Sequence, residues 1–354
     1  MFSIQKPRIA LKEKKINGIG LSIDDYGGGP STLCGGCGHD SVTAAIITAC
    51  FELSVPPEQV AKMSGIGCSS KTPGYFLKTA HAFNAVHGRM PSVTTGAYAA
   101  NRNMYYLAVS GDGDTGSIGL GQFMHALRRK LNMLYMIENN GVYGLTKGQF
   151  SALADTGSLN RKGDENLFPA MDPVRLAIEA GASFVARSFS GDKKQLIPLI
   201  KSGLRHKGFA LIDVLSPCVS FNNHPGSTRS YDYIRAHEDE ATHIEDFIPI
   251  RDEIVSSNRR NESGLQTIAL HDGSHLLLRE TSKNQDVSSK KSALEFLDQC
   301  QNRGEIATGL FYCDPEPREF HDLTGSSPVP LRDLPMETLI PESRVLETIN
   351  QTFR

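Results

Sequence analysis

Short apolar runs alternate with segments of helical periodicity along the chain as far as residue 214. Four runs are predicted to be strands, and the first two are apolar enough to be buried on both faces of a sheet. The strands span residues 104–109, 133–137, 183–185 and 209–214. Helical spacing or small residues indicate helices at residues 41–53, 93–101, 118–127 and 176–180. This alternation predicts an α/β fold with a doubly wound parallel sheet.

The sequence pattern changes near residue 235. Residues 236–293 are rich in charge, and residues 315–345 hold many of the prolines. A hairpin is predicted near residues 264–279. We therefore interpret the chain as an N-terminal arm, a main domain and a C-terminal extension that wraps the core or a partner. The three parts are residues 1–30, 31–235 and 236–354.

Composition narrows the class of protein. The 354 residues include 37 Lys and Arg and 39 Asp and Glu, interspersed along the chain. This balance gives no indication of nucleic acid or an anionic membrane as a partner. No segment approaches the roughly 20 apolar residues that span a bilayer. The N-terminus lacks the apolar core of a signal peptide, so we expect a cytoplasmic protein. Seven widely spaced cysteines argue against a disulfide framework and leave metal or redox chemistry open.

Polar residues follow the first two predicted strands. The first strand runs into Gly111-Asp112-Gly113-Asp114, and the second ends at Asn139-Asn140. In a right-handed βαβ unit the loops after both strands lie at one edge of the sheet, so Asp112 and Asn140 are predicted to converge. Carboxylate, amide and carbonyl oxygens suit Mg²⁺, and glycines let backbone N–H groups reach phosphate oxygens. An ordinary acidic turn is the alternative, and the paired spacing disfavours it.

This arrangement resembles the signature of the thiamine-diphosphate fold, in which GDG is followed by NN. The resemblance implies that Asp112 and Asn140 are side-chain ligands of Mg²⁺, and that the Val142 carbonyl is a third protein ligand. It also implies that Gly111, Gly113 and Asp114 line the diphosphate.

Four cysteines lie in three separate loops. Cys34 and Cys37 form a CxxC turn, Cys68 lies in GIGCSSK, and Cys218 lies in SPC. Four thiolates can ligate zinc or a [4Fe–4S] cluster, and cysteine counting alone favours zinc. Thiamine chemistry beside these loops reverses that preference, because electrons that leave a thiamine intermediate need an acceptor.

The loops CGGCGHD, GIGCSSK and SPC resemble, in the same order, the cluster-binding loops of the thiamine-diphosphate-binding (beta) subunits of 2-oxoacid:ferredoxin oxidoreductases. The resemblance is strong over roughly residues 30–235 and loose over residues 300–354. It implies one [4Fe–4S] cluster held by Cys34, Cys37, Cys68 and Cys218. The three other cysteines match nothing in this pattern and are expected to be inert or part of the core; they are Cys50, Cys300 and Cys313. Further cofactor contacts are implied at Gly38, His39, Gly67, Gly144 and Leu145.

Five residues are expected on the substrate side of the site, namely His39, Lys71, Leu145, Thr146 and Lys147. A lone histidine is more often structural, and lysines are often solvated, but these loops lie between the predicted cluster and cofactor. Two lysines favour a dicarboxylate over pyruvate, because an ionised group taken out of water needs a partner. Family members that act on 2-oxoglutarate are similar to this chain in GCSSK and GLTKGQ.

The resemblance implies oxidative decarboxylation of 2-oxoglutarate with coenzyme A to succinyl-CoA and CO₂. Electrons would pass through the cluster to ferredoxin, and the reverse reaction would fix CO₂, as in the reductive TCA cycle. The chain shows no convincing second thiamine half-site. A companion alpha subunit is therefore expected to supply the carboxylate that activates the aminopyrimidine and most of the coenzyme A site. The alternatives are a pyruvate or branched 2-oxoacid enzyme of the same family, and a non-catalytic zinc-bound α/β scaffold.

Overall fold

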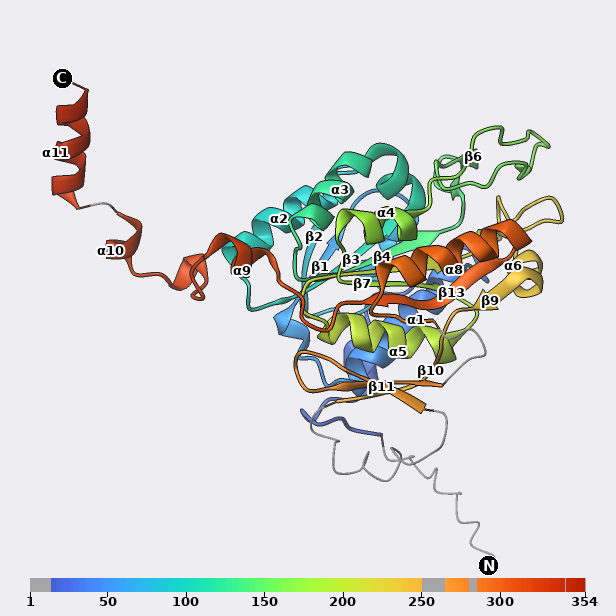
Figure 1. The fold of residues 1–354 in the computed structure, drawn as a ribbon, viewed down its shortest axis with the longest axis horizontal. Coiled ribbons are helices and arrows are strands. Elements are labelled where there is room, and N and C mark those ends of the chain that lie inside the picture. Colours follow the sequence, from blue (N-terminus) through green and yellow to red (C-terminus); the bar gives the residue numbers. More distant parts are fainter. Residues whose placement is uncertain (1–13, 250–264, 280–284, 341, 354) are drawn as a thin grey trace, which may run out of the picture.

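A mostly parallel sheet of eight strands runs through the molecule (Figure 1). The computed structural model describes residues 14–249, 265–279, 285–340 and 342–353. In spatial order the strands are β2 (His81–Asn84), β1 (Val60–Ser64), β3 (Tyr105–Gly111), β4 (Met133–Asn139), β8 (Phe209–Leu215), β7 (Phe184–Phe189), β13 (Ile306–Cys313) and β9 (Glu238–Glu240). Neighbouring strands are parallel except where β13 meets β7. The doubly wound α/β fold expected from the sequence is confirmed.

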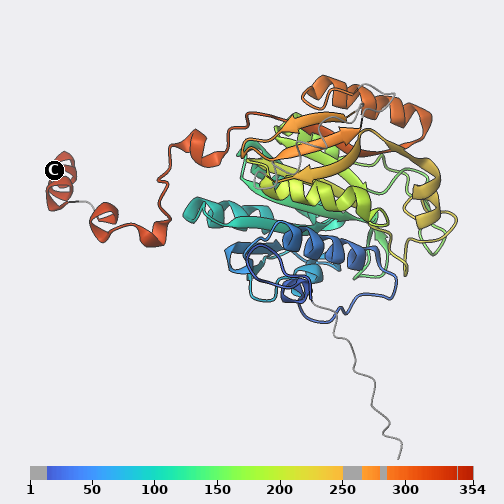
Figure 2. The same cartoon turned by 90° about the horizontal axis from the view of Figure 1, so that it is seen from below.

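Helices cover both faces of this sheet (Figures 1 and 2). One face packs against α1 (Gly38–Glu52) and α5 (Lys193–Arg205). The other face packs against α2 (Met90–Ala100), α3 (Leu120–Arg128), α4 (Pro173–Ala180) and α8 (Lys290–Arg303). Side chains of a strand point alternately to the two faces. In β4, Leu134 and Met136 enter the first core, whereas Met133, Tyr135 and Ile137 enter the second. Burial on both faces explains why residues 133–137 of β4 are all apolar.

The segment after residue 235 contributes to the main sheet as well as to a smaller one. Strand β13 pairs with β7, and β9 pairs with β13, so the sheet crosses the boundary drawn at residue 235. A second, antiparallel sheet contains β10 (His243–Ile248), β12 (His275–Arg279) and β11 (Leu265–Ala269), in that order. Its apolar side chains share the core beneath α5. Strands β11 and β12 form the hairpin that was predicted near residues 264–279.

Short elements connect these layers. Further helical turns in the described residues are η1 (Ile23–Tyr26), η2 (Pro57–Gln59), η3 (Ser69–Gly74), η4 (Gly113–Ile118), α6 (Tyr231–His237) and η6 (Leu331–Asp333). The remaining strands, β5 (Val142–Tyr143) and β6 (Gln149–Phe150), pair with each other. Among the described residues, no helix is both long and apolar enough to cross a bilayer.

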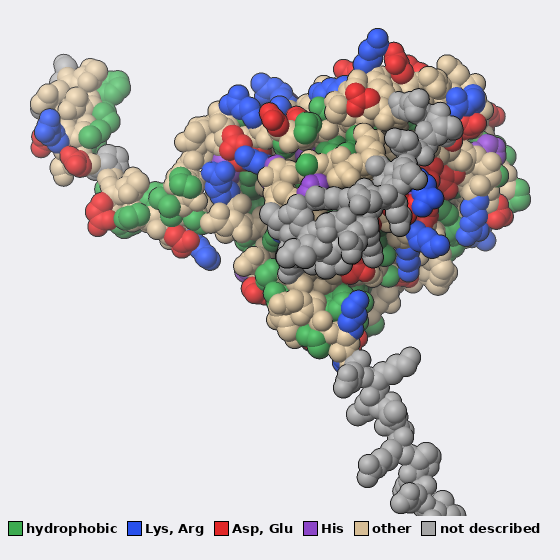
Figure 3. Space-filling view, turned by 60° about the horizontal axis from the view of Figure 1, so that its bottom comes forward, with side chains coloured by type: hydrophobic (Ala, Val, Ile, Leu, Met, Phe, Trp, Pro, Cys, Tyr) green, Lys and Arg blue, Asp and Glu red, His purple; other side chains and the backbone are tan. Residues whose placement is uncertain are grey.

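The end of the chain forms an arm that projects from the domain. The arm leaves the body after α9 (Phe320–Thr324) and carries α10 (Met336–Leu339) and α11 (Ser343–Thr352) (Figure 1). Hydrophobic side chains are exposed along it (Figure 3). They include Leu331, Met336, Ile340, Leu346 and Ile349.

A buried lysine holds the loop that follows β1. The Lys62 side chain is 4% exposed, and its ammonium donates hydrogen bonds to the carbonyls of Pro73 (2.7 Å), Phe76 (2.8 Å) and Leu77 (2.9 Å). Leu77 has a φ of 45°, in the left-handed region that most side chains avoid. Lys62 therefore fixes the end of the loop that begins with Cys68.

We expect Lys62→Met to lower the free energy of unfolding by about 3 kcal/mol, because three buried carbonyls lose their donor. Urea denaturation of the two proteins measures this difference. Lys78→Met is the matched control, since Lys78 is exposed and lies in the same loop. The control should change stability by less than about 0.5 kcal/mol. Equal stability of the Lys62 variant and the wild type would contradict the prediction.

Candidate functional site

The loops after β3 and β4 meet at the carboxyl edge of the sheet. Gly111 pairs with Glu138 across the two strands, so the residues that follow are neighbours. The Asp112 side chain is buried, and its carboxylate accepts hydrogen bonds from the Ser151 hydroxyl and from the backbone N–H of Asn140. The structure therefore brings Asp112 and Asn140 together, as their spacing predicted.

The turn at Asn139 and Asn140 is held by local hydrogen bonds. The Asn140 side-chain oxygen accepts a hydrogen bond from the Val142 N–H at 3.1 Å. The Asn140 carbonyl accepts one from the Asn222 amide at 2.7 Å. Asn139 donates instead to Asp213, at 3.0 Å. The two asparagines therefore differ in role, and Asn140 is the one that lies beside Asp112.

The environment of Asp112 suits a cation. Burial raises the pKa of this carboxyl to about 6, although the hydrogen bonds from Ser151 and Asn140 act in the opposite direction. Among the described residues, Asp112 forms no ion pair with a lysine, arginine or histidine. A buried carboxylate is costly unless a positive charge accompanies it. With the amide oxygen of Asn140 close by, the donor set fits a hard divalent ion such as Mg²⁺.

Glycine allows the two loops to pack tightly. A Cβ atom on Gly113 would lie 2.4 Å from the Tyr143 ring, so no larger residue fits there. The Tyr143 hydroxyl donates to the Gly113 carbonyl at 3.1 Å. At Gly111, a Cβ atom would lie 2.8 Å from the Ser69 hydroxyl. The glycines therefore allow the Tyr143 ring and the Ser69 side chain to pack directly against the backbone of this loop.

The Asp114 carboxylate forms hydrogen bonds with neighbouring loops. Its buried carboxylate accepts hydrogen bonds from the Gly88 N–H (2.7 Å), the Ser110 hydroxyl (2.8 Å) and the His87 Nδ1. A Cβ atom on Gly65 would lie 1.9 Å from this carboxylate, which explains the glycine there. Sequence reasoning did not single out His87, because it follows the short strand β2, which hydrophobicity did not reveal.

The four predicted cluster cysteines lie in loops around this edge. Cys34 is exposed, Cys37 is buried, and Cys68 and Cys218 are half-buried. A Cβ atom on Gly144 would lie 3.5 Å from the Cys68 sulfur and 3.6 Å from the Cys218 sulfur. Burial, and then the nearby Cys218 thiol, raise the pKa of Cys68. The loop after β4 therefore contacts two of the cysteines directly.

The positions of these sulfurs can be compared with those that a single zinc ion requires. Zinc binds four sulfurs at about 2.3 Å in a tetrahedron, which places them about 3.8 Å apart. The described residues include all four cysteines, and no three of these sulfurs lie within 4.8 Å of one another. In a [4Fe–4S] cluster each cysteine binds a different iron, so the sulfurs lie farther apart. As they lie here, the four sulfurs therefore do not form a tetrahedral zinc site.

Buried polar groups connect the cysteine loops behind this site. His39 lies at the start of α1, with its Nδ1 at 2.6 Å from the Ser216 hydroxyl and 3.6 Å from a Glu138 oxygen. The Thr72 hydroxyl donates to Glu138 at 2.9 Å. Burial lowers the pKa of His39 to about 4 and raises that of Glu138 well above its usual value. The His39 imidazole is therefore neutral near pH 7, and burial favours the protonated form of Glu138. The sequence could not reveal Glu138, because it lies inside an apolar strand.

The other predicted residues line the outer side of the same loops. Lys71 and Lys147 are exposed. The positive charge of Lys71 counteracts the rise in the pKa of Cys68, so the two side chains are close. Leu145 is 52% exposed, and the Thr146 hydroxyl donates to the Gln149 side chain at 2.6 Å. Of the two remaining predicted glycines, Gly38 packs against the Ser216 hydroxyl, and Gly67 has a φ of 130°.

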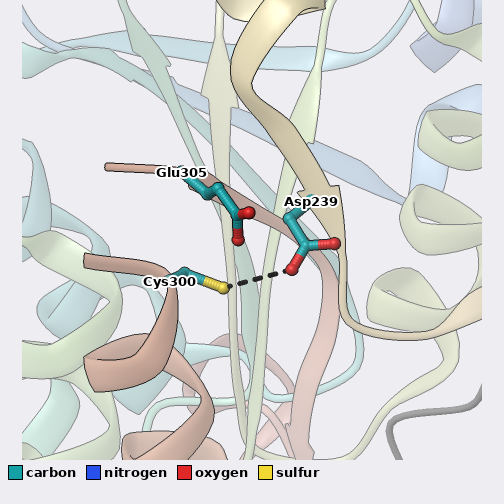
Figure 4. A group of neighbouring side chains, drawn as sticks. All are labelled: Asp239, Cys300 and Glu305. Atoms are coloured by element: carbon teal, nitrogen blue, oxygen red, sulfur yellow. Dashed lines mark hydrogen bonds between the residues drawn. The ribbon is translucent and has the colours of Figure 1, made fainter. Parts of the chain in front are cut away.

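A different group of metal-type side chains lies elsewhere, between α8 and β9. Asp239, Cys300 and Glu305 point toward one another (Figure 4). The Arg303 guanidinium donates to Asp239 at 3.0 Å and to Glu305 at 2.7 Å. An arginine therefore already supplies the positive charge for this acidic group.

Comparisons with known proteins agree with this geometry. Residues 65–214 match the family model "Thiamine pyrophosphate enzyme, C-terminal TPP binding domain". The 2-oxoacid:ferredoxin oxidoreductase subunit beta of a Sulfolobus species is 42% identical over 194 residues, which are 54% of this chain. The matched part spans 63% of that relative.

Two further comparisons cover more of the related chain. The 2-oxoglutarate synthase subunit KorB of Methanocaldococcus jannaschii is 36% identical over 193 residues, 54% of this chain and 71% of the relative. The solved structure of 2-oxoglutarate:ferredoxin oxidoreductase from Magnetococcus marinus has a TM-score of 0.69 at 27% identity and covers 88% of this chain and 91% of that chain. That structure contains bound 2-oxoglutarate, coenzyme A and succinyl-CoA. The chain belongs to the enzyme family of 2-oxoacid:ferredoxin oxidoreductases, as a beta subunit with a thiamine-diphosphate-binding fold.

Proposed function

We propose that this chain is the thiamine-diphosphate-binding subunit of a 2-oxoglutarate:ferredoxin oxidoreductase. In this proposal Asp112, Asn140 and the Val142 carbonyl hold Mg²⁺ with thiamine diphosphate, and the four cysteines hold a [4Fe–4S] cluster. The complex converts 2-oxoglutarate and coenzyme A to succinyl-CoA and CO₂ and transfers electrons to ferredoxin. The reaction is reversible.

The observation that carries the proposal is the contact at Gly144. This residue follows the proposed Mg²⁺ ligands and packs against the sulfurs of Cys68 and Cys218. Bound thiamine diphosphate supplies a carbanion and an electron sink for loss of CO₂. Electrons can pass from the cofactor to a cluster only if the two lie close together. Here one loop contributes to both proposed sites.

The surrounding residues of this chain hold the proposed groups in place. The neutral His39 imidazole lies between the cysteine loops and is oriented by Ser216. We assign His39 and Gly38 to contacts with the cofactor, together with Gly67 and Gly144. Asp114 organises the loops at Gly65 and Gly88, so we propose that it positions the diphosphate site rather than contacting phosphate itself.

An exposed apolar rim supports a companion subunit. Ile66, Val86, Ile118 and Leu145 lie in the loops that surround the proposed cofactor site, and they are 37%, 75%, 46% and 52% exposed. Apolar side chains gathered at one edge indicate a protein interface. We propose that a companion alpha subunit covers this rim and brings the carboxylate that activates the aminopyrimidine, with most of the coenzyme A site.

Lys71 and Lys147 are proposed to bind the second carboxylate of 2-oxoglutarate, with Leu145 and Thr146 lining the same side. We expect Lys71→Ala and Lys147→Ala each to raise KM for 2-oxoglutarate about 10-fold to 100-fold, since a hydrogen bond to a charged group contributes about 1.5–3 kcal/mol. KM for pyruvate should change much less. The assay is coenzyme A-dependent reduction of a low-potential acceptor by the anaerobically purified complex.

Lys193→Ala, on the exposed face of α5, is the matched control and should leave both KM values unchanged. Equal changes for the two substrates would contradict the assignment of the lysines. A wild-type preference for pyruvate or a branched 2-oxoacid would replace 2-oxoglutarate as the substrate and leave the family unchanged. No reduction with any 2-oxoacid, despite bound thiamine diphosphate and iron, would overturn the proposed reaction.

A further inference from the structure

A serine hydroxyl is directed at one of the four cysteine sulfurs. Ser220 lies two residues after Cys218, and its hydroxyl donates to the Cys34 sulfur at 3.1 Å. The two residues are 186 positions apart in the sequence and belong to different loops. Cys34 is the exposed member of the four cysteines. The hydroxyl therefore donates to the sulfur of the most exposed of the four cysteines.

The loop that carries Ser220 is anchored on several sides. The N–H of Asn222 donates to the Cys218 carbonyl at 2.9 Å, and its side chain donates to the Asn140 carbonyl at 2.7 Å. The Arg161 guanidinium donates to the Ser220 carbonyl at 3.0 Å. These contacts fix the backbone on both sides of Ser220, so the loop holds its hydroxyl near Cys34.

The neighbouring sulfurs receive donors of a different kind. Backbone N–H groups act on Cys37, from His39, and on Cys218, from Phe221 and Ser220. A backbone donor remains when a side chain is replaced. The donor to Cys34 is a side-chain hydroxyl, so one substitution can remove it and leave the cysteine in place.

We propose that Ser220 is a positioning residue that raises the reduction potential of the cluster by donating a hydrogen bond to the Cys34 sulfur. This inference rests on the proposed [4Fe–4S] cluster. Reduction adds one electron, and part of its negative charge spreads onto the cysteine sulfurs. A hydrogen bond donated to a sulfur stabilises that charge, so it favours the reduced state. Loss of the hydroxyl therefore makes the cluster harder to reduce.

The test is a redox titration of the complete complex, followed by electron paramagnetic resonance of the reduced cluster. At the wild-type midpoint potential, Ser220→Ala should show a ratio of reduced to oxidised cluster about fivefold to tenfold lower. A tenfold change corresponds to a shift of 59 mV toward lower potential for one electron. Ser220→Thr keeps a hydroxyl and should titrate close to the wild type. Ser220 is half-buried in a surface loop, so its replacement should preserve the fold.

Ser31→Ala is the matched control. Ser31 lies in the loop of Cys34, but its hydroxyl donates to Asp40 and not to a sulfur. The control should keep the wild-type potential; a shift as large as that of Ser220→Ala would trace the effect to loosening of the loop and overturn the inference. An unchanged potential in Ser220→Ala, with a normal iron content, would also overturn it. A wild-type complex without iron and sulfide would overturn the proposed function itself.

Discussion

Asp112→Asn is expected to abolish tight binding of Mg²⁺ and thiamine diphosphate while making the metal-free protein more stable. Second-shell changes at metal sites weaken binding about 10-fold to 100-fold, so loss of a direct ligand should weaken it by at least about 100-fold. The asparagine keeps an oxygen that accepts hydrogen bonds from Ser151 and Asn140. The change therefore removes the charge and leaves the shape of the site almost intact.

The gain in stability follows from the raised pKa of Asp112. In the folded protein this pKa is about 6, compared with an ordinary value of 3.8, because burial disfavours the charged form. Well above pH 6 the carboxylate is charged in both the folded and the unfolded protein. Its burial in the folded protein then lowers the free energy of unfolding by about 3 kcal/mol. As pH falls from 6 toward 4, the folded protein binds the proton first, so the wild type regains this stability. The advantage of the variant should therefore be full at pH 7 and small at pH 4.

Calorimetric titration with Mg²⁺ and thiamine diphosphate measures binding, and denaturation at pH 7 and pH 4 measures stability. Asp164→Asn is the matched control, because Asp164 is exposed and hydrogen-bonded to Asn160. The control should keep both properties. Retained binding in the Asp112 variant would rule out Asp112 as a ligand. A metal-free variant less stable than the wild type at pH 7 would contradict the electrostatic argument.

Cys68→Ala is expected to empty the proposed cluster site and to stop electron transfer to ferredoxin. One of four ligands is lost from a half-buried position, and the three remaining sulfurs leave one iron without a protein ligand. Acceptor reduction should fall by at least about 100-fold, because even second-shell changes at a metal site cost about 10-fold to 100-fold. Thiamine diphosphate binding should remain, because Asp112 and Asn140 are unchanged.

Iron and sulfide analysis of the anaerobically purified complex is the measurement. Cys313→Ala provides the control, since burial raises the pKa of the Cys313 thiol to about 12 and this cysteine lies in the core of β13. The control should keep its full iron content. Full iron content in Cys68→Ala would exclude Cys68 as a ligand. Zinc in the wild-type protein, in place of iron and sulfide, would favour the non-catalytic scaffold.

The sequence predicted elements whose burial is uniform. Strands β3, β4 and β8 each contain a continuous apolar run, so hydrophobicity alone indicated them. Strand β1 was missed because it contains Lys62, whose ammonium is hydrogen-bonded by carbonyls of the loop that follows the strand, 11 to 15 residues away. Helix α5 was missed because Pro198 interrupts a segment that is polar on one side, although its other side is buried. Local pattern cannot reveal a partner that is remote in the sequence.

The same limit applies to the candidate site. The convergence of Asp112 and Asn140 was predictable, because the rules for parallel sheets place both loops at one edge. Glu138, His87 and Ser220 were not predicted, because each is defined by contacts with loops far away in the chain. Sequence motifs predicted the proposed metal ligands, and the fold shows which other residues contact their loops.

The antiparallel position of β13 determines the order in which the protein can complete its fold during synthesis. Until residue 313 has left the ribosome, β7 is an unpaired edge of a growing sheet, because β13 is its neighbour on that side. An open edge of this kind is a template for pairing with other chains. The nascent chain therefore carries the complete set of proposed ligands, from Cys34 to Cys218, well before β13 has paired with β7. The interval between synthesis of the last proposed ligand and pairing of β7 with β13 lasts for about a hundred residues of translation, which is several seconds or more at typical rates of synthesis.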